Sequence, residues 1–264
     1  MYETFYRFRE KPFHVTADPA FLFLSRQHQE ALDHLTYGIR ERLGFIVITG
    51  EVGTGKTTLA KALVERLSPD TQTALILNPA LSGTPFLQSI LKDFGAASNG
   101  TRLSRGELLQ KIEQFLLSQA GSQTGGVLII DEAQALSSSA LEQVRLLSNV
   151  ETPKTKLIQI VLIGQPELTE RLNRERRLRA LRQRIAVWYE LKSLSPDEVA
   201  PYIRHRIHVA CSEEPPLFTE GALTKIARLS EGIPRRINGL CDQALLAGFV
   251  KESRAIDEEL IKED

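Results

Sequence analysis

The stretch GFIVITGEVGTGKTTLAKAL, from Gly44 to Leu63, decides the fold of this chain. A run of apolar and β-branched residues, Phe45–Thr49, predicts a buried strand. A glycine-rich turn follows and ends in Gly55-Lys56-Thr57, where an apolar pattern of helical spacing begins. A buried strand, a glycine-rich turn and a helix in this order are typical of an α/β protein with a parallel sheet.

The turn matches the phosphate-binding pattern G-x-x-x-x-G-K-[ST] from Gly50 to Thr57. Glycines let consecutive backbone N–H groups point at phosphate oxygens, and the start of the following helix adds the positive end of its dipole. Lys56 supplies a positive charge to the β- and γ-phosphates, and the Thr57 hydroxyl ligates Mg²⁺. The predicted nucleotide-binding residues are Gly50, Glu51, Val52, Gly53, Thr54, Gly55, Lys56, Thr57 and Thr58.

Two carboxylates follow another apolar run, Val127–Ile130, which predicts the third strand of the sheet. Ligands of open α/β sheets bind at the carboxyl ends of the strands, where Asp131 and Glu132 stand. This is a Walker B pattern, in which Asp131 holds Mg²⁺ and Glu132 is the general base for water. A carboxylate next to the magnesium-binding aspartate favours hydrolysis over transfer to an acceptor substrate.

Further strands are predicted at Thr73–Asn78, Leu157–Ile163 and Ile185–Leu191. Helices are predicted from Ser25 to Leu43, from Lys56 to about Leu67, and at about 84–95, 104–119 and 138–149. Because the strands alternate with helices and are apolar on both faces, we expect a five-stranded parallel sheet covered by helices on both sides. The expected fold class is a three-layer α/β/α domain.

The pattern changes after Leu191, where no further strand is predicted. Ser195-Pro196-Asp197 starts a helix, and two more begin near Thr219 and after Pro234. We therefore predict an α/β nucleotide-binding domain at 1–191, whose segment 1–24 is aromatic and irregular, and a small all-α lid domain at 192–264.

Composition limits the function classes. The 264 residues are 42% hydrophobic and 25% charged, and the zero formal net charge gives no overall attraction to nucleic acid or acidic lipid. No signal peptide is predicted, and no apolar run reaches the roughly 18 residues of a membrane span. Two distant cysteines, Cys211 and Cys241, fit a reducing compartment. No metal site is predicted at the histidines, which are His14, His28, His34, His205 and His208.

Three later features bear on the chemistry. Gln165 ends the fourth strand, where we expect its side chain to reach between the two acidic residues and the γ-phosphate, although Gln165-Pro166 also suits a helix start. The run Arg171–Ile185 holds seven arginines and one acid. It is a solvated basic face, an interface that inserts an arginine into a neighbour's ATP site, or a DNA-backbone contact. Arg182 and Arg184, directly before the fifth strand, favour the interface.

Taken together, these features resemble the AAA+ ATPase plan. Several strings further resemble the ATPase region of the general secretion pathway protein A family, and the resemblance covers nearly the whole chain. The strings are FYRFREKPFHVTADPAFLFLSRQHQEAL, GEVGTGKTTL, IIDEAQALS, LEQVRLLSNVET, QIVLIGQPEL and LRALRQRI, whereas GIPRRIN is part of the resemblance to the AAA+ plan.

The resemblance implies a role for each matching residue. Gln165 takes the sensor-1 position, and Arg184, or else Arg182, resembles the arginine finger. Arg235 matches the sensor-2 arginine at the start of a lid helix, and Pro12 and Phe13 are expected near the adenine. The implied cofactors are ATP or ADP and Mg²⁺.

The resemblance also implies a homo-oligomer, such as a hexamer-like ring, that drives or regulates assembly of a secretion, pilus or envelope export apparatus. Its expected partners are membrane or envelope secretion components. The secretion protein of this family continues through a membrane span into a periplasmic peptidoglycan-binding region, and this sequence has neither. The resemblance therefore implies either the cytoplasmic fragment of such a protein or a soluble relative from another export system. We therefore expect a cytoplasmic protein at the inner membrane. A partner would hold it there, or a C-terminal region that is missing from this sequence.

Two other functions stay open. One is a DNA-binding AAA+ regulator of the kind that selects transposition targets, which the basic run motivates and the zero net charge disfavours. The other is a nucleotide sensor without catalysis, which Glu132 disfavours.

Overall fold

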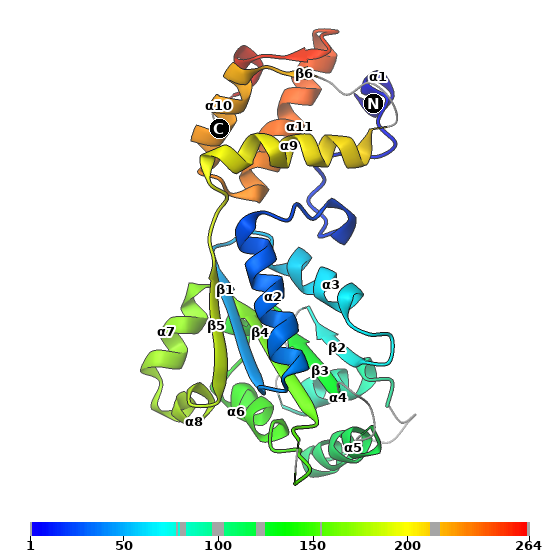
Figure 1. Ribbon diagram of the computed structural model, residues 1–264, viewed down its shortest axis with the longest axis vertical. Helices are drawn as coiled ribbons and strands as arrows, with labels where there is room; N and C mark the ends of the chain where they lie inside the picture. Colours follow the sequence, from blue (N-terminus) through cyan, green and yellow to red (C-terminus); the bar gives the residue numbers. More distant parts are fainter. Residues whose placement is uncertain are drawn as a thin grey trace. The chain divides into compact units, whose positions relative to one another are not determined.

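The computed structural model describes residues 2–77, 79, 83–96, 103–119, 125–153, 155–211 and 217–262. The chain forms two compact units (Figure 1). The sheet unit comprises Glu30–Gly50 and Leu59–Leu191, and the helical unit comprises Met1–Gln29, Glu51–Thr58 and Lys192–Asp264. In the described part of the chain, every helix is too short or too polar to cross a membrane.

A five-stranded parallel sheet forms the centre of the sheet unit, in the strand order β2-β3-β4-β1-β5. The strands are β1 (Phe45–Gly50), β2 (Gln72–Ile76), β3 (Gly126–Ile130), β4 (Ile158–Gly164) and β5 (Ile185–Leu191). Every residue of β1, β3 and β4 is buried, as expected for strands covered on both faces. The predicted strands are confirmed, except that Asn78 lies outside the described residues.

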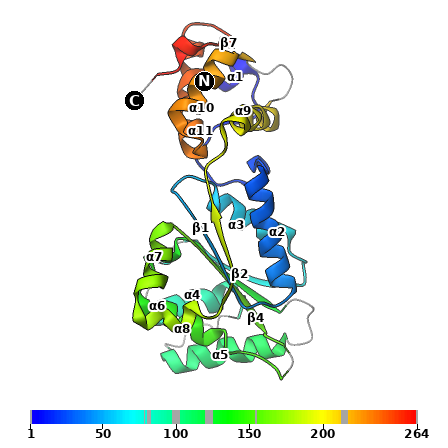
Figure 2. The same cartoon turned by 60° about the vertical axis from the view of Figure 1, so that its left-hand side comes forward.

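Helices cover both faces of this sheet (Figure 2). On one face lie α2 (Arg26–Arg40) and α3 (Lys56–Arg66), and on the other lie α4 (Thr84–Asp93), α5 (Arg105–Ser118), α6 (Ser138–Leu147), α7 (Pro166–Arg174) and α8 (Arg179–Arg182). Short 3-10 turns, η2 (Ala133–Ala135) and η3 (Arg176–Leu178), precede α6 and α8. The predicted three-layer fold is confirmed.

The side chains of β1 alternate between the two faces of the sheet and contribute to an apolar layer on each face. Phe45 and Val47 belong to the core that includes α4 to α8. Ile46 faces α2, where a Cβ atom on Gly38 would lie 2.6 Å from its side chain. The absence of a side chain at Gly38 thus lets α2 pack closely on the strand that leads into the glycine-rich turn.

The C-terminal part of the helical unit contains α9 (Pro196–Ala210), α10 (Glu220–Ser230), α11 (Pro234–Val250) and the 3-10 turn η4 (Glu258–Leu260). Ser195 is the N-cap of α9, and its backbone N–H donates to Glu198 at 3.1 Å, which confirms the predicted helix start. The all-α prediction missed one detail. Two-residue strands, β6 (Leu217–Phe218) and β7 (Ala255–Ile256), pair in parallel, and they are too short for an alternating pattern.

The N-terminal segment packs into the core of the helical unit, whereas the sequence grouped it with the α/β domain. The Tyr6 hydroxyl lies 3.2 and 3.0 Å from the carbonyl oxygens of Leu245 and Ser253. This segment forms α1 (Tyr2–Tyr6) and the 3-10 turn η1 (Pro19–Phe21). Its buried aromatic side chains are Tyr2, Tyr6, Phe8, Phe13 and Phe21. The functional division at 191/192 stays a prediction.

Arg206 of α9 anchors this segment. Its Nε donates to the carbonyl oxygen of Pro12 at 2.6 Å, and a terminal nitrogen donates to the carbonyl of His14 at 3.3 Å. The guanidinium lies 4.8 Å from the centre of the Phe21 ring, and the residue is 6% exposed. A buried charge with several hydrogen bonds and an aromatic ring holds the chain firmly.

Replacing Arg206 with Met should destabilise the protein by about 2–3 kcal/mol, because one buried and one partly buried carbonyl group lose a charged donor. Urea unfolding monitored by circular dichroism measures this change. Arg204→Met is the matched control in the same helix, since Arg204 pairs with Glu220 in solvent and should cost less than about 1 kcal/mol. Equal losses in the two variants would contradict the anchoring role of Arg206.

Candidate functional site

The glycine-rich turn has a backbone that only glycines adopt easily. Gly53 and Gly55 have φ angles of +83° and +97°, in the left-handed region. A Cβ atom on Gly53 would lie 2.6 Å from the Cβ of Arg235, and one on Gly55 would lie 3.0 Å from Nε2 of His28. Both glycines are therefore required by conformation and by close neighbours.

Lys56 lies across the turn and is 5% exposed. Its ammonium group donates to the carbonyl oxygen of Glu51 at 2.7 Å, and the Thr54 hydroxyl donates to the same oxygen at 2.8 Å. The turn is thus closed on itself, with the lysine charge held at its centre. Thr57 follows in the first turn of α3.

Arg235 contacts the turn through its backbone. Its N–H donates to the carbonyl oxygen of Gly53 at 3.2 Å, and Pro234 is the first residue of α11. The start of this helix therefore lies against the glycine-rich turn, so the structure brings together Arg235 and the predicted phosphate-binding residues.

His28 supports the turn from the N-terminal end of α2, and the sequence had not singled it out. Its Nε2 lies 3.1 Å from the carbonyl oxygen of Thr54, and its Nδ1 lies 2.7 Å from the Ser25 hydroxyl. Nε2 therefore donates and Nδ1 accepts. Burial lowers the pKa of His28 below its usual value, which keeps the ring neutral at pH 7. One sequence signal existed, because His28 stands on the same helix face as the apolar Leu32 and Leu35.

Asp131 and Glu132 follow the carboxyl end of β3. Asp131 is 1% exposed, and its carboxylate accepts the backbone N–H of Glu132 at 2.9 Å. Glu132 has a φ of +51°, in the left-handed region that non-glycine residues rarely adopt. Because β1 and β3 are both parallel to the intervening β4, the glycine-rich turn and the acidic pair leave the sheet at the same edge.

Gln165, at the end of β4, contacts Glu132. Its side-chain amide donates to the Glu132 carboxylate at 3.1 Å. The side chain of Gln134 reaches the same carboxylate and is a second residue that the sequence did not single out. The Asp131 carboxylate offers oxygen atoms of the kind that Mg²⁺ prefers, so this residue fits a magnesium ligand.

The arginine run divides into held and exposed side chains. Arg184 donates to the Ser148 hydroxyl at 2.7 Å and to Asn149, and Arg171 donates to the carbonyl oxygens of Gln134 and Leu136, both at 2.7 Å. The exposed arginines are Arg174, Arg176, Arg177, Arg179 and Arg182. The solvated-face interpretation therefore holds for only part of the run.

Pro12 and Phe13 lie in the helical unit. Phe13 is 2% exposed, and its ring centre lies 6.3 Å from that of Phe218 in an edge-to-face arrangement. The ring therefore belongs to the core of the helical unit, and the predicted contact is with an adenine base. That contact stays a prediction.

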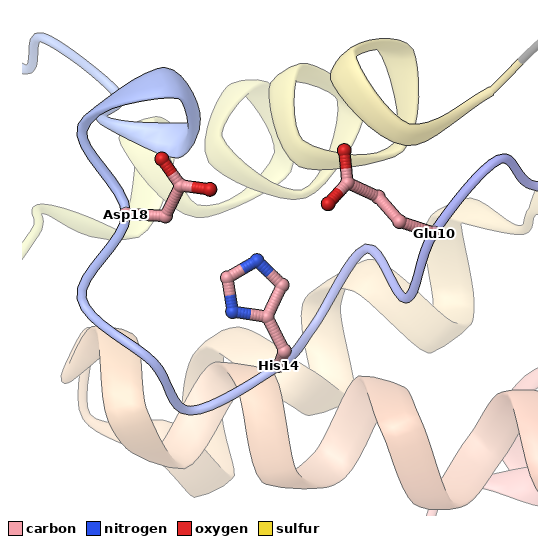
Figure 3. A group of neighbouring side chains, drawn as sticks. All are labelled: Glu10, His14 and Asp18. Carbon is pink, nitrogen blue, oxygen red and sulfur yellow. The ribbon is translucent and has the colours of Figure 1, made fainter.

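Glu10, His14 and Asp18 lie together in the N-terminal segment (Figure 3). Their potential ligand atoms are all within 4.8 Å of one another, although the sequence showed no metal-binding spacing at His14. Carboxylates near the surface often gather without an ion, and Asp18 already accepts the backbone N–H of Ala20 at 2.9 Å. We assign no metal to this group.

Known proteins resemble this chain in sequence and in fold. A family model described as an AAA domain matches residues 39–172. General secretion pathway protein A of Aeromonas hydrophila is 44% identical over 259 residues, which are 97% of this chain and 46% of that protein. An uncharacterized HTH-type transcriptional regulator of Methanocaldococcus jannaschii is 35% identical over 86 residues, 31% of this chain and 21% of that protein. The chain thus spans about half the length of the first relative.

Solved structures share the fold at low identity. An ORC2 protein of Aeropyrum pernix, with bound ADPNP and ADP, has a TM-score of 0.71 at 18% identity, covering 96% of this chain and 71% of its own. Cdc6p of Pyrobaculum aerophilum has a TM-score of 0.73 at 17% identity, with coverages of 93% and 67%. The RuvB Holliday junction branch migration motor of Thermotoga maritima has a TM-score of 0.59 at 19% identity, with coverages of 90% and 67%.

The position of His28 predicts a pH dependence of stability. Because its pKa is lowered in the folded chain, the unfolded chain binds the proton more readily below pH about 6.5. The contribution of the neutral His28 to stability is therefore present above pH about 6.5 and is lost as the pH falls. The stability difference between the wild type and His28→Gln should be largest at pH 7.5 and should shrink toward pH 5.

Urea unfolding of both proteins from pH 5 to pH 8 measures this difference. His205, whose pKa is also lowered by burial, is present in both proteins and cancels. A difference that stays constant with pH would contradict the neutral, hydrogen-bonded His28.

Proposed function

Because this chain belongs to the AAA domain family, we propose that it binds ATP with Mg²⁺ and hydrolyses it to ADP and phosphate. The observation that carries this proposal is the arrangement at one edge of the sheet. A closed glycine-rich turn holding Lys56 follows β1, and a Glu132–Gln165 contact follows β3 and β4. Hydrolysis needs both parts, one for the phosphates and one for the water.

Each residue has a proposed task. The backbone N–H groups of the turn and the Lys56 charge bind the β- and γ-phosphates. Thr57 and Asp131 hold Mg²⁺, which when bound neutralises charge on the phosphate oxygens. Glu132 accepts the proton of the attacking water, and Gln165 orients that water or the γ-phosphate. Arg235, whose backbone binds the turn, senses the γ-phosphate with its side chain.

An arginine from a neighbouring subunit completes the proposed site. Of the two candidates, the sequence favoured Arg184, but its guanidinium is held by Ser148 and Asn149. Arg182 is exposed at the end of α8 and is free to reach a second copy of the chain. We therefore propose Arg182 as the finger, and Arg184 as a residue that fixes the segment before β5.

The proposed biological role is assembly of a secretion, pilus or envelope export apparatus. It rests on the 44% identity to general secretion pathway protein A over 97% of this chain. In this role the protein is a homo-oligomer, ring-shaped in the simplest case, that meets membrane or envelope components at the cytoplasmic face of the inner membrane. ATP binding and hydrolysis then switch the contacts with those components.

DNA binding is the second candidate function, and the exposed arginines motivate it. Arg176, Arg177, Arg179 and Arg182 give a local positive surface on η3 and α8, although the net charge of the chain is zero. The solved structures are below 20% identical, so they add the fold and no function. The export role is therefore the favoured proposal.

Two variants should separate binding from hydrolysis. Lys56→Ala should lose ATP binding, measured by fluorescence of a labelled ATP analogue. Glu132→Gln should bind ATP as the wild type does and lose at least 100-fold in turnover, because a general base contributes about 10²–10⁴. Wild-type turnover per subunit should rise steeply with protein concentration and should not need duplex DNA.

Two results would contradict this function. Undiminished turnover in Glu132→Gln would remove Glu132 as the base. Turnover that is near zero at every protein concentration until duplex DNA is added would favour the DNA-binding regulator.

A further inference from the structure

Gln134 occupies a central place in the contacts around Glu132. Its side-chain nitrogen donates to Oε2 of Glu132 at 2.5 Å, and its side-chain oxygen accepts the backbone N–H of Gln165 at 3.1 Å. Gln165 in turn donates to the same Oε2 at 3.1 Å. Both ends of one amide therefore connect residues that follow two different strands, β3 and β4.

The chemistry of these donors suits a proton acceptor. Both glutamine amides are neutral, so they orient the carboxylate without pairing it with a positive charge. They meet at Oε2, and in the described part of the chain no hydrogen bond is seen at Oε1. A cation bound to Glu132 would instead compete with its role as a base.

The backbone that carries Gln134 is itself held by a cation. One terminal nitrogen of Arg171 donates to the carbonyl oxygens of Gln134 and Leu136, both at 2.7 Å. Its Nε donates to Glu175 at 2.8 Å, and the Ser138 hydroxyl and this ion pair lower the pKa of Glu175. Arg171 thus fixes η2 through carbonyl groups, and its charge is neutralised by Glu175 instead of by Glu132.

Gly164 leaves room for this contact. A Cβ atom at this position would lie 2.9 Å from the side-chain oxygen of Gln134 and 2.9 Å from the Leu168 side chain. A glycine at the end of β4 therefore lets the amide of Gln134 approach the backbone of Gln165.

We propose that Gln134 is a positioning residue for hydrolysis: it fixes the carboxylate of Glu132 so that Oε1 faces the attacking water, and it fixes Gln165 beside it. This proposal rests on the proposed function of Glu132 as the base. In the step itself, the water oxygen forms a bond to the γ-phosphorus, the bond from that phosphorus to the bridging oxygen of ADP breaks, and the water proton passes to Glu132.

The test replaces Gln134 with Met, which has nearly the same shape and lacks the amide. We expect kcat for ATP to fall about 10- to 100-fold, because a misplaced catalytic group costs on this order. The dissociation constant for labelled ATP and the melting temperature should stay close to the wild-type values. Gln110→Met, on the exposed surface of α5, is the matched control and should leave all three unchanged.

A double-mutant cycle separates positioning from a structural effect. If Gln134 acts only through Glu132, then Gln134→Met should cause no further loss in a Glu132→Ala background, measured in single-turnover reactions with labelled ATP. The proposal would be overturned if kcat of Gln134→Met stayed within twofold of the wild type. It would also be overturned if Gln134→Met lowered turnover as much in the Glu132→Ala background as in the wild type.

A readout without nucleotide tests the contact itself. In protein labelled with ¹⁵N-glutamine, the side-chain amide signals of Gln134 and Gln165, assigned from their Met variants, should shift in Glu132→Ala. Unshifted signals would contradict the hydrogen bonds from Gln134 and Gln165 to Glu132 and overturn the proposal. An inactive wild type with shifted signals would instead contradict the proposed hydrolysis and leave the contact standing, so the two failures are distinguishable.

Discussion

The turn between β1 and α3 can be held only because Gly53 and Gly55 leave no side chain in its way. Arg235 bonds to the backbone at Gly53, and His28 bonds to the carbonyl of Thr54 next to Gly55. These two residues come from opposite ends of the sequence, at the start of α11 and near the start of α2. The left-handed glycine conformations of the turn are therefore supported by neighbours on both sides.

The acidic residues after β3 are likewise held by their neighbours, and the groups that hold Glu132 are neutral. Glu132 is held by two amides, and Arg171 donates to backbone carbonyl groups and to Glu175. The arginine run thus does two jobs. Arg171 and Arg184 hold the structure around the site, and the exposed arginines of η3 and α8 remain available to a neighbouring molecule. Replacing the whole run at once would confuse these two effects.

Much of the fold could be predicted from the sequence, because buried parallel strands are apolar along their whole length. The prediction Ile185–Leu191 is identical to β5, and Phe45–Thr49 differs from β1 by one residue. The five-residue α1 and the β6–β7 pair were missed, since elements this short have no periodicity. The packing of segment 1–29 on the C-terminal helices was also missed, because its aromatic residues find their partners only in the folded chain.

In the candidate site, too, some residues could be predicted from the sequence and others could not. Motifs identified Lys56, Asp131 and Glu132, because phosphate and magnesium chemistry fixes their spacing. No spacing rule identifies the left-handed backbone of Glu132 or the role of Gln134, whose contacts with Gln165 and Arg171 join residues far apart in the sequence. The roles of these residues in catalysis stay predictions until they are measured.

In the proposed function, two copies of this chain build one hydrolytic site. Mixing Arg182→Ala subunits, which keep Glu132, with Glu132→Gln subunits, which keep Arg182, tests it directly. Each variant alone should be nearly inactive, since an arginine finger contributes about 10³–10⁵ to turnover. The mixture should regain ATP hydrolysis, because some sites then combine an intact Glu132 with a neighbour's Arg182. A mixture as inactive as its two components would contradict the claim.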